Sequence, residues 1–327
     1  MRLNGLGEDE PFELFDKPDA DPGPAQVAIR VHATSINPVD AAIRSGAGKL
    51  APEDPIVLGC DVAGVVMATG PGVTRFSVGD EVYGCAGGVK GHDGAYSQRM
   101  IADERLLGRK PASLSFREAA ALPLVSITAW EALVDRAQVR PGETVLVHGG
   151  TGGVGHVGVQ LAKSMGAIVH TTVPTPERAE IAKSLGADKT ILYREQSVAE
   201  YVGELTNGRG YDVVFDTVGG PNIALSIEAL AINGRCVTIV SIGAQPDLTG
   251  LHMKNASLLV VFMLIPMLTG QGLERHGTIM ERVSALADHG RIKPLLDDSR
   301  CTLTELEAAH EQLTSGRAVG KVVVDIG

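Results

Sequence analysis

A glycine-rich turn between an apolar strand and a helix constrains the fold of this chain more than any other feature. The apolar run Thr144–Val147 leads into the pattern Gly150-x-Gly152-x-x-Gly155, and an amphipathic helical pattern follows up to Gly166. Such glycines permit a tight turn, let a pyrophosphate approach the backbone and let the helix pack on the strand. The phosphates then lie at a helix N-terminus, whose free N–H groups and partial positive charge bind anions.

A flexible glycine loop is the alternative explanation of this pattern. The legible strand before the glycines and the helix after them favour dinucleotide binding over that alternative. The residues that we expect to contact a cofactor at this turn are Gly150, Gly152, Gly153, Val154 and Gly155.

The size, charge and cysteine content of the chain narrow the class of protein. Its 327 residues suffice for two domains, and its net charge of −10 disfavours a nucleic-acid partner or an anionic membrane surface. The four cysteines are scattered with no Cys-x-x-Cys pair, which predicts reduced thiols and a cytoplasmic setting. The longest apolar stretch, Leu258–Leu268, is too short to span a bilayer and is predicted to be buried structure or an interface.

The chain changes character along its length. Residues 1–120 are rich in alternating strand patterns and turn signals, which predicts a compact β-barrel-like domain. The segment Ser115–Glu118 has the pattern of a capping box that opens a helix. From Thr144 onwards strands and helices alternate, which predicts a parallel sheet with crossover helices.

Short motifs spread over almost the whole chain carry a resemblance to a known family. These motifs are Ser35–Asp40, Ile43–Gly46, Gly59–Gly64, Gly79–Gly84, Gly94–Tyr96, Ala120–Leu124, Thr128–Trp130 and Gly320–Val322. In this order, and with the glycine turn, they resemble the zinc-independent quinone oxidoreductase branch of the medium-chain dehydrogenase/reductase superfamily. The resemblance implies an α/β protein with a GroES-like β-barrel domain (1–120) and a Rossmann doubly wound parallel sheet that binds NADP (121–255). It also implies a C-terminal segment (256–327) that completes the sheet and packs back on the first domain.

The positions that hold zinc in metal-using relatives carry other residues here. Those relatives use a Cys, a His and a second Cys, whereas Asn37 and Cys60 stand at the first two positions and the region around Leu124 supplies no second Cys. A zinc site needs three or four converging ligands, so we expect no metal. Without a Lewis acid, quinones and enones are easier acceptors than an unactivated carbonyl, because the developing oxyanion needs only hydrogen-bond donors.

The end of the second predicted Rossmann strand favours NADPH over NADH. NAD-binding folds usually place an acid there, whereas Thr172, which we expect to contact the cofactor, leaves this strand tip neutral. Arg178, at the start of the next helix, has the planar guanidinium that pairs well with phosphate oxygens. In related quinone reductases, a basic residue here and a tyrosine like Tyr193 contact the 2′-phosphate. The alternative is a solvated Arg178 paired with Glu177 or Glu180.

Asn37 is the predicted catalytic residue. Its amide can donate to a substrate oxygen and cannot ionise, which suits oxyanion stabilisation without a metal. A turn cap before Pro38 is an equally good and compatible explanation of this asparagine. Thr128 resembles the family threonine that meets the nicotinamide, with helix packing as its alternative. The ends of later Rossmann strands add three expected cofactor contacts, with simple turn chemistry as the alternative for the glycine: Val218, Ser241 and Gly243.

The sequence therefore predicts an NADPH-dependent oxidoreductase that passes hydride to a small-molecule quinone or other α,β-unsaturated carbonyl. Two alternatives stay open: an alcohol dehydrogenase-type activity, and a non-catalytic NADPH-binding protein. We expect a cytoplasmic homodimer that binds neither nucleic acid nor membrane. The physiological substrate is not specified by these residues.

Overall fold

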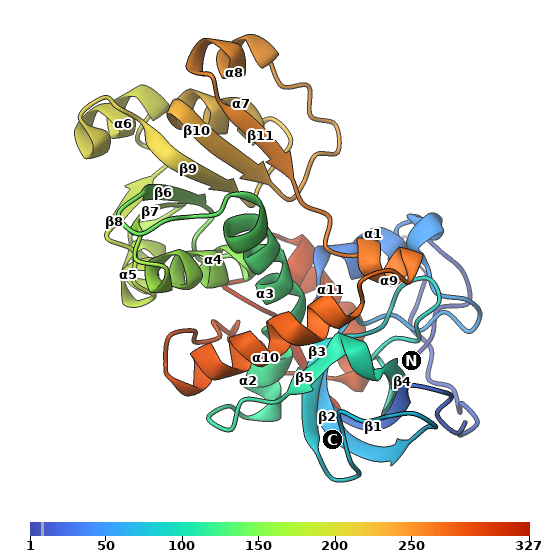
Figure 1. Cartoon of the computed structure of the whole chain (residues 1–327). Helices are drawn as coiled ribbons and strands as arrows, with labels where there is room; N and C mark the ends of the chain where they lie inside the picture. Colours follow the sequence, from blue (N-terminus) through green and yellow to red (C-terminus); the bar gives the residue numbers. More distant parts are fainter. Residues whose placement is uncertain (8–9) are drawn as a thin grey trace. The chain divides into compact units, whose positions relative to one another are not determined.

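The computed structural model describes residues 1–7 and 10–327, which form two compact units (Figure 1). Unit 1 consists of residues 1–127, 264–290 and 294–327. Unit 2 consists of residues 128–263 and 291–293. The last part of the chain thus belongs to the same unit as the first part, and the dinucleotide-binding pattern lies in unit 2.

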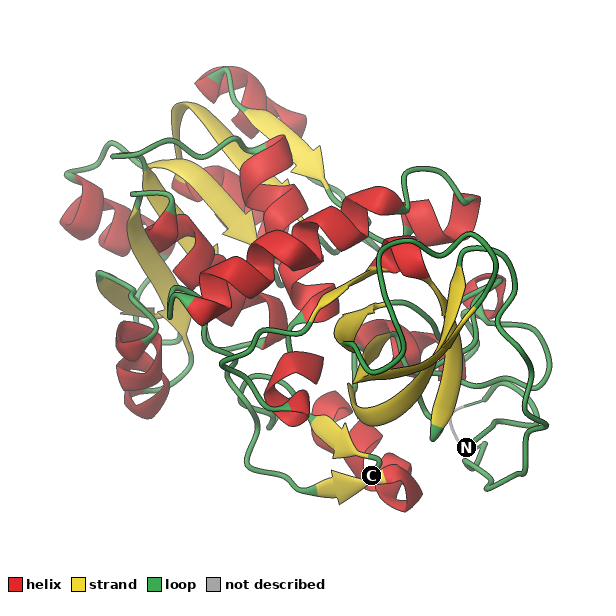
Figure 2. Cartoon of the chain, turned by 60° about the horizontal axis from the view of Figure 1, so that its bottom comes forward, coloured by secondary structure: helices red, strands yellow, loops and turns green. Residues whose placement is uncertain are grey.

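Unit 1 is built on a strongly curved seven-stranded sheet, whose strands are yellow in Figure 2. Its strands are β1 (Gln26–Ser35), β2 (Asp61–Thr69), β3 (Glu81–Cys85), β4 (Arg99–Asp103), β5 (Leu107–Arg109), β12 (Cys301–Thr302) and β13 (Val323–Asp325). The path runs β12-β13-β1-β2-β3-β5, and β4 also pairs with β1. The long strand β1 therefore holds the barrel together, and it receives β13 from the far end of the chain.

Helices pack around this barrel. They are α1 (Pro38–Arg44), α2 (Phe116–Ala120), α9 (Ile265–Thr269), α10 (Glu274–Asp288) and α11 (Leu306–Thr314), with short 3-10 turns η1 (Gly48–Leu50), η2 (Glu104–Leu106) and η4 (Leu303–Glu305). The predicted capping box is confirmed, because Ser115 and Glu118 exchange side-chain-to-backbone hydrogen bonds at the start of α2. Helix α3 (Pro123–Trp130) begins in unit 1 and continues into unit 2.

Unit 2 contains the predicted parallel sheet, with the strand order β11-β10-β9-β6-β7-β8. Its strands are β6 (Thr144–His148), β7 (Ile168–Val173), β8 (Lys189–Leu192), β9 (Tyr211–Asp216), β10 (Leu230–Thr238) and β11 (Ser257–Val260). Helices α4 (Gly153–Ser164) and α5 (Pro176–Ser184) cover one face of this sheet (Figure 1). Helices α6 (Val198–Thr206), α7 (Asn222–Ala229) and α8 (Leu248–Lys254) cover the other face, over a core that includes Leu146, Tyr211 and Val214. The π-helical turn η3 (Glu131–Arg136) continues α3.

The apolar stretch Leu258–Leu268 is not one buried segment. It is divided between the end of β11 and the start of α9, so that Val261 and Leu264 are buried while Val260 and Phe262 are about half exposed. Across the part of the chain that the structure describes, none of the helices combines the length and apolar character needed to cross a bilayer.

Candidate active site

The glycine turn after β6 has the geometry that a phosphate-binding loop requires. A Cβ atom at Gly150 would lie 2.1 Å from the hydroxyl oxygen of Thr171, and one at Gly155 would lie 2.0 Å from the carbonyl oxygen of Gly149. Both positions therefore exclude any side chain. Helix α4 begins just past Gly152, and no side chain of the described residues caps this end, which is the kind of helix N-terminus that binds anions.

The turn also depends on a glycine just before the motif. Gly149 has a left-handed backbone, with φ +73°, and it precedes Gly150, the first glycine of the motif. Gly150 is required for a different reason, the close approach of Thr171. Of the two glycines after His148, Gly149 is needed for its backbone conformation and Gly150 for close packing.

Thr172 holds the turn from the neighbouring strand β7. Its hydroxyl oxygen accepts the Gly149 N–H at 3.0 Å and lies 3.2 Å from Nδ1 of His148, and its carbonyl accepts the Gly150 N–H at 3.2 Å. Burial lowers the pKa of His148 to about 4, which keeps this histidine neutral beside the loop. The structure therefore shows Thr172 as a support of the turn, and its direct contact with a cofactor stays a prediction.

Arg178 lies beside the glycine turn. It is on the first turn of α5, and its guanidinium Nη1 lies 3.4 Å from the hydroxyl of Thr151 within the turn. Nearby, Glu177 accepts a hydrogen bond from Thr175, and Glu180 pairs with Lys183 at 2.7 Å. A guanidinium next to a neutral strand tip and a phosphate-binding turn is suited to a second phosphate group.

The other expected cofactor contacts lie at the carboxyl ends of the sheet strands or just beyond them. Tyr193 follows β8, Val218 follows β9, and both side chains are about half exposed. Asp216, which the motif reading did not single out, shapes the turn at Val218: one carboxylate oxygen accepts the N–H groups of Val218 at 2.9 Å and Gly219 at 2.8 Å. Further along the chain, Ser241 and the positive-φ Gly243 are exposed in the loop after β10, and Thr128 is buried on α3.

In unit 1, Asn37 is fully buried at the start of α1. Its backbone N–H donates to Asp40 at 2.9 Å, which is the capping arrangement that the sequence allowed. Its side-chain Nδ2 donates to Oδ2 of Asp61 at 2.9 Å and makes a longer contact of 3.4 Å with the carbonyl of Ser35. Its Oδ1 accepts from Lys321. The structure thus shows Asn37 as a cap inside a buried polar network, and the predicted contact with a substrate stays a prediction.

Asp40 and Cys60 lie next to this network. Oδ1 of Asp40 accepts the Gly59 N–H at 3.1 Å and lies 3.6 Å from the thiol of Cys60. Burial raises the pKa of Asp40 to about 6, although the Asn37 N–H partly offsets it. The pKa of Cys60 is also raised, by its hydrogen bond to Cys85 and by burial, so this thiol is protonated.

The described residues contain no group of three or more His, Cys, Asp or Glu side chains arranged to hold a metal ion. Asn37, Cys60 and Leu124 are each engaged in packing or hydrogen bonds, with the Leu124 N–H donating to Asp61 at 2.8 Å. These three positions therefore lie in a hydrogen-bonded interior.

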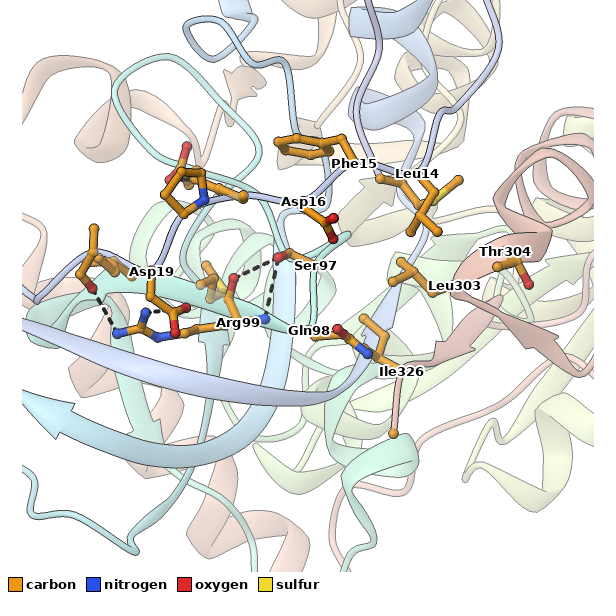
Figure 3. A pocket seen from close by; sticks show the side chains of 18 of the residues that line it. Leu14, Phe15, Asp16, Asp19, Ser97, Gln98, Arg99, Leu303, Thr304 and Ile326 are labelled. Carbon is orange, nitrogen blue, oxygen red and sulfur yellow. Dashed lines mark hydrogen bonds and ion pairs between the residues drawn. The ribbon is translucent and has the colours of Figure 1, made fainter.

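A pocket of about 750 Å³ in unit 1 shares no residue with the Asn37 network (Figure 3). One wall is the extended segment Leu14–Ala20, and others come from Ser97–Ile101 and Thr302–Thr304. Arg99 and Asp19 lie side by side in this pocket (Figure 3) and form an ion pair at 2.6 Å, and Arg99 also donates to the Ala20 carbonyl. The Arg99–Asp19 pair thus ties the segment Leu14–Ala20 to the start of β4.

Comparison with known proteins agrees with this architecture. The family model for the alcohol dehydrogenase GroES-like domain matches residues 23–112, and the model for zinc-binding dehydrogenases matches residues 153–268. A quinone oxidoreductase of Pseudomonas aeruginosa is 35% identical over 99% of this chain and 98% of its own length. A 2-haloacrylate reductase of a Burkholderia species is 40% identical over 66% of this chain and 65% of its own length.

Two solved structures show the same fold over nearly the whole chain. An alcohol dehydrogenase superfamily protein from Novosphingobium aromaticivorans has a TM-score of 0.94 and 38% identity, covering 98% of both chains. The Escherichia coli quinone oxidoreductase in complex with NADPH has a TM-score of 0.82 and 28% identity, covering 95% of this chain and 94% of that one.

The chain also matches part of some much larger proteins. It is 32% identical to a segment of a reducing polyketide synthase of Cochliobolus heterostrophus, with 98% of this chain spanning 12% of that protein. The full-length match to the quinone oxidoreductase, the two domain models and the predicted GroES-like and Rossmann units agree with one another. The chain belongs to the medium-chain dehydrogenase/reductase family of oxidoreductases, and within it to the quinone oxidoreductase-like members.

Proposed function

We propose that this protein transfers hydride from NADPH to a quinone or another α,β-unsaturated carbonyl compound, without catalytic zinc. The observation that carries the proposal is the glycine turn with Arg178 beside it. The uncapped N-terminus of α4 offers N–H groups for a pyrophosphate, and the guanidinium near Thr151 offers a partner for a 2′-phosphate. The NADPH complex of the Escherichia coli relative supports this choice of cofactor.

The class of acceptor is supported by the names of two relatives. Quinones and 2-haloacrylates share an electron-poor carbon–carbon double bond conjugated to an oxygen-bearing group. Hydride addition to such a bond places negative charge on that oxygen, which hydrogen-bond donors can stabilise. Bound NADPH supplies the hydride, and the protein has to hold the dinucleotide and orient the acceptor.

Asn37 is the residue that we propose to donate to the acceptor oxygen. Its first amide hydrogen is committed to Asp61 at 2.9 Å, whereas the second has only the 3.4 Å contact with the Ser35 carbonyl. That second hydrogen is the one that a better-placed oxyanion would take. Because the Asn37 side chain is fully buried, an acceptor can take this hydrogen only by reaching the amide and replacing the Ser35 carbonyl as its partner.

The test is NADPH oxidation measured side by side with a benzoquinone, an enal, an enone, a 2-haloacrylate and a saturated aldehyde. We expect turnover with the conjugated compounds and little with the saturated aldehyde. Oxidation of simple alcohols with NADP, or reduction of the saturated aldehyde alone, would contradict the proposal. No reduction of any acceptor by a protein that binds NADPH would favour the non-catalytic alternative.

The description of one matching family model favours a zinc-dependent alcohol dehydrogenase as the second candidate. The matched range, residues 153–268, includes neither Asn37 nor Cys60 nor Leu124, which are the positions of the catalytic ligands in metal-using relatives. Elemental analysis of the purified protein separates the two candidates. One tightly held zinc per chain, lost together with activity on chelation, would establish the second candidate.

We also propose that the protein is a cytoplasmic homodimer. Strand β11 is the edge of the parallel sheet, and its exposed Val260 together with the adjacent Phe262 would be covered by a second copy. The four cysteines are free and buried, in keeping with a reducing compartment. Size-exclusion chromatography with light scattering measures the mass of the assembly. The mass of a monomer would contradict the proposed homodimer.

A further inference from the structure

One buried carboxylate in unit 1 receives hydrogen bonds from two segments that the proposed mechanism needs. Oδ2 of Asp61 accepts from the hydroxyl of Ser35 at 2.7 Å and from Nδ2 of Asn37 at 2.9 Å. Its other oxygen, Oδ1, accepts the backbone N–H of Leu124 at 2.8 Å, in the first turn of α3. Asp61 is fully buried, so these bonds replace its hydration.

A single buried lysine lies against the same site. Lys321, which is 3% exposed, donates to Oδ1 of Asn37 and to the carbonyl of Ile36 at 2.9 Å. Its ammonium is also 3.5 Å from Oδ2 of Asp61. A buried carboxylate needs such a counter-charge, and an ammonium with three donors can serve several acceptors at once.

The arrangement fixes which way the Asn37 amide points. Its oxygen faces the ammonium of Lys321, and its nitrogen faces the carboxylate of Asp61. A flipped amide would place its oxygen against a carboxylate and its N–H groups against an ammonium, which both charges oppose. The same carboxylate sets the start of α3, the helix that carries Thr128.

We propose that Asp61, neutralised by Lys321, is a positioning residue that orients the Asn37 amide and fixes the first turn of α3. The inference rests on the proposed function, because it gives the orientation of Asn37 a catalytic purpose. Neither Asp61 nor Lys321 touches the reacting atoms in this scheme. They act through Asn37 and through the helix that carries Thr128.

The experiment compares Lys321→Met, Asp61→Asn and the double variant Asp61→Asn/Lys321→Met with the wild type. Each protein is assayed for kcat and for the KM of NADPH, and its backbone hydrogen exchange is followed by mass spectrometry. Lys163→Met is the matched control, because Lys163 forms an exposed pair with Asp188 at 2.6 Å in unit 2. The double variant removes both charges together and so avoids an unpaired buried charge.

We expect Lys321→Met to lower kcat at least tenfold with the KM of NADPH changed by less than about twofold, since the transition-state contact is lost and cofactor binding is not. The double variant is expected to regain thermal stability relative to the single variants while its kcat stays low. Peptides covering residues 35–44 and 121–130 are expected to exchange faster in all three variants, whereas Lys163→Met behaves as the wild type.

The link to Asn37 is tested by non-additivity. In an Asn37→Ala background, Lys321→Met should lower kcat by clearly less than its tenfold effect in the wild type, because the amide that it orients is already gone and only the route through α3 remains. Fully additive losses would overturn the proposal, as would wild-type kcat in Lys321→Met or in the double variant.

A failure of the proposed function gives a different result. If the wild type reduced none of the acceptors, that function would fall, and hydrogen exchange would decide the positioning role alone. Unchanged exchange over residues 35–44 and 121–130 in the folded variants would then overturn it.

Discussion

The glycine turn of unit 2 and the Asn37 network of unit 1 are built by opposite means. The turn is made by backbone within one short stretch, where Gly150 and Gly155 leave no room for a side chain. The network is made by side chains from distant segments, and Lys321 and Asp61 are 260 residues apart in the sequence. The glycine turn thus depends on steric fit, and the Asn37 network depends on electrostatic interactions.

Because of this difference, we expect substitutions in the two regions to have different effects. A side chain added to the turn displaces backbone, so the cofactor site is lost as a unit. A substitution in the network leaves the backbone in place, but a buried charge or amide then loses its hydrogen-bond partner. We therefore expect changes in the turn to remove NADPH binding, and changes in the network to affect turnover and pH dependence.

The largest expected effect comes from Gly155→Val. The added Cβ atom would meet the Gly149 carbonyl oxygen at 2.0 Å, so the turn and the start of α4 have to move apart. We expect NADPH affinity to fall at least about a hundredfold, on the order of 3 kcal/mol or more. Isothermal titration measures this loss.

Gly203→Ala is the matched control for that substitution. Gly203 lies in α6, and a Cβ atom there would meet nothing within 4 Å. This change should leave NADPH affinity unaltered and raise stability by roughly 0.5–1 kcal/mol. Normal NADPH binding by Gly155→Val would show that the turn is not the phosphate site.

The second effect is that of Asn37→Ala on turnover. A preorganised neutral donor is worth roughly 3–4 kcal/mol in the transition state, so kcat should fall about a hundredfold or more while NADPH binding stays nearly intact. Asn37→Asp should be worse, because a carboxylate repels the forming oxyanion. Steady-state kinetics with a quinone decides this, and a folded Asn37→Ala protein with full kcat would reduce Asn37 to a helix cap.

The third effect concerns pH and Asp40. Burial raises the pKa of Asp40 from its ordinary 3.8 to about 6. A raised folded pKa contributes stability that is present below about pH 4 and is lost as the pH rises through 6. That loss is worth roughly 3 kcal/mol. His148 acts in the opposite sense over the same window, because its pKa is lowered to about 4.

The difference between wild type and Asp40→Asn isolates the Asp40 contribution, since His148 is present in both. Urea unfolding at a series of pH values is expected to show the wild type losing stability relative to Asp40→Asn between pH 4 and pH 7. If the difference in unfolding free energy between the two proteins stayed constant across that range, the pKa of Asp40 would not be raised in the folded protein.

The smallest effect is that of Arg178→Ala on cofactor choice. Loss of a phosphate contact should cost on the order of 1.5–3 kcal/mol in NADPH affinity, with little change for NADH. Fluorescence titration of both cofactors checks this, and Arg178→Lys tests whether the guanidinium fork is needed. Unchanged NADPH affinity in Arg178→Ala would mean that Arg178 only packs on the turn through Thr151.

The two regions also differ in how well the sequence predicts them. The glycine turn, the parallel sheet and the Ser115 capping box follow from residues that are neighbours in the chain, and local patterns are enough to recognise them. Even there, the conformational role of Gly149 was missed, because motif spacing counts glycines and does not give φ angles.

The Asn37 network could not be derived in the same way. The sequence around Asp61 does not predict its contacts with Ser35, Leu124 and Lys321. Those contacts form only once β1, β2, α3 and the C-terminal segment have come together. A signal was nevertheless present at Lys321, a charged residue directly before the apolar run Val322–Val324. A lysine that enters a buried strand needs a buried partner, and that requirement points to an acid elsewhere in unit 1.

We propose that the glycine turn, with Arg178 beside it, binds NADPH in preference to NADH. This preference can be measured by titrating one preparation of the wild-type protein with each cofactor and following the change in cofactor fluorescence. We expect NADPH to bind at least about tenfold more tightly than NADH, which corresponds to about 1.4 kcal/mol. Equal affinities, or tighter binding of NADH, would contradict it.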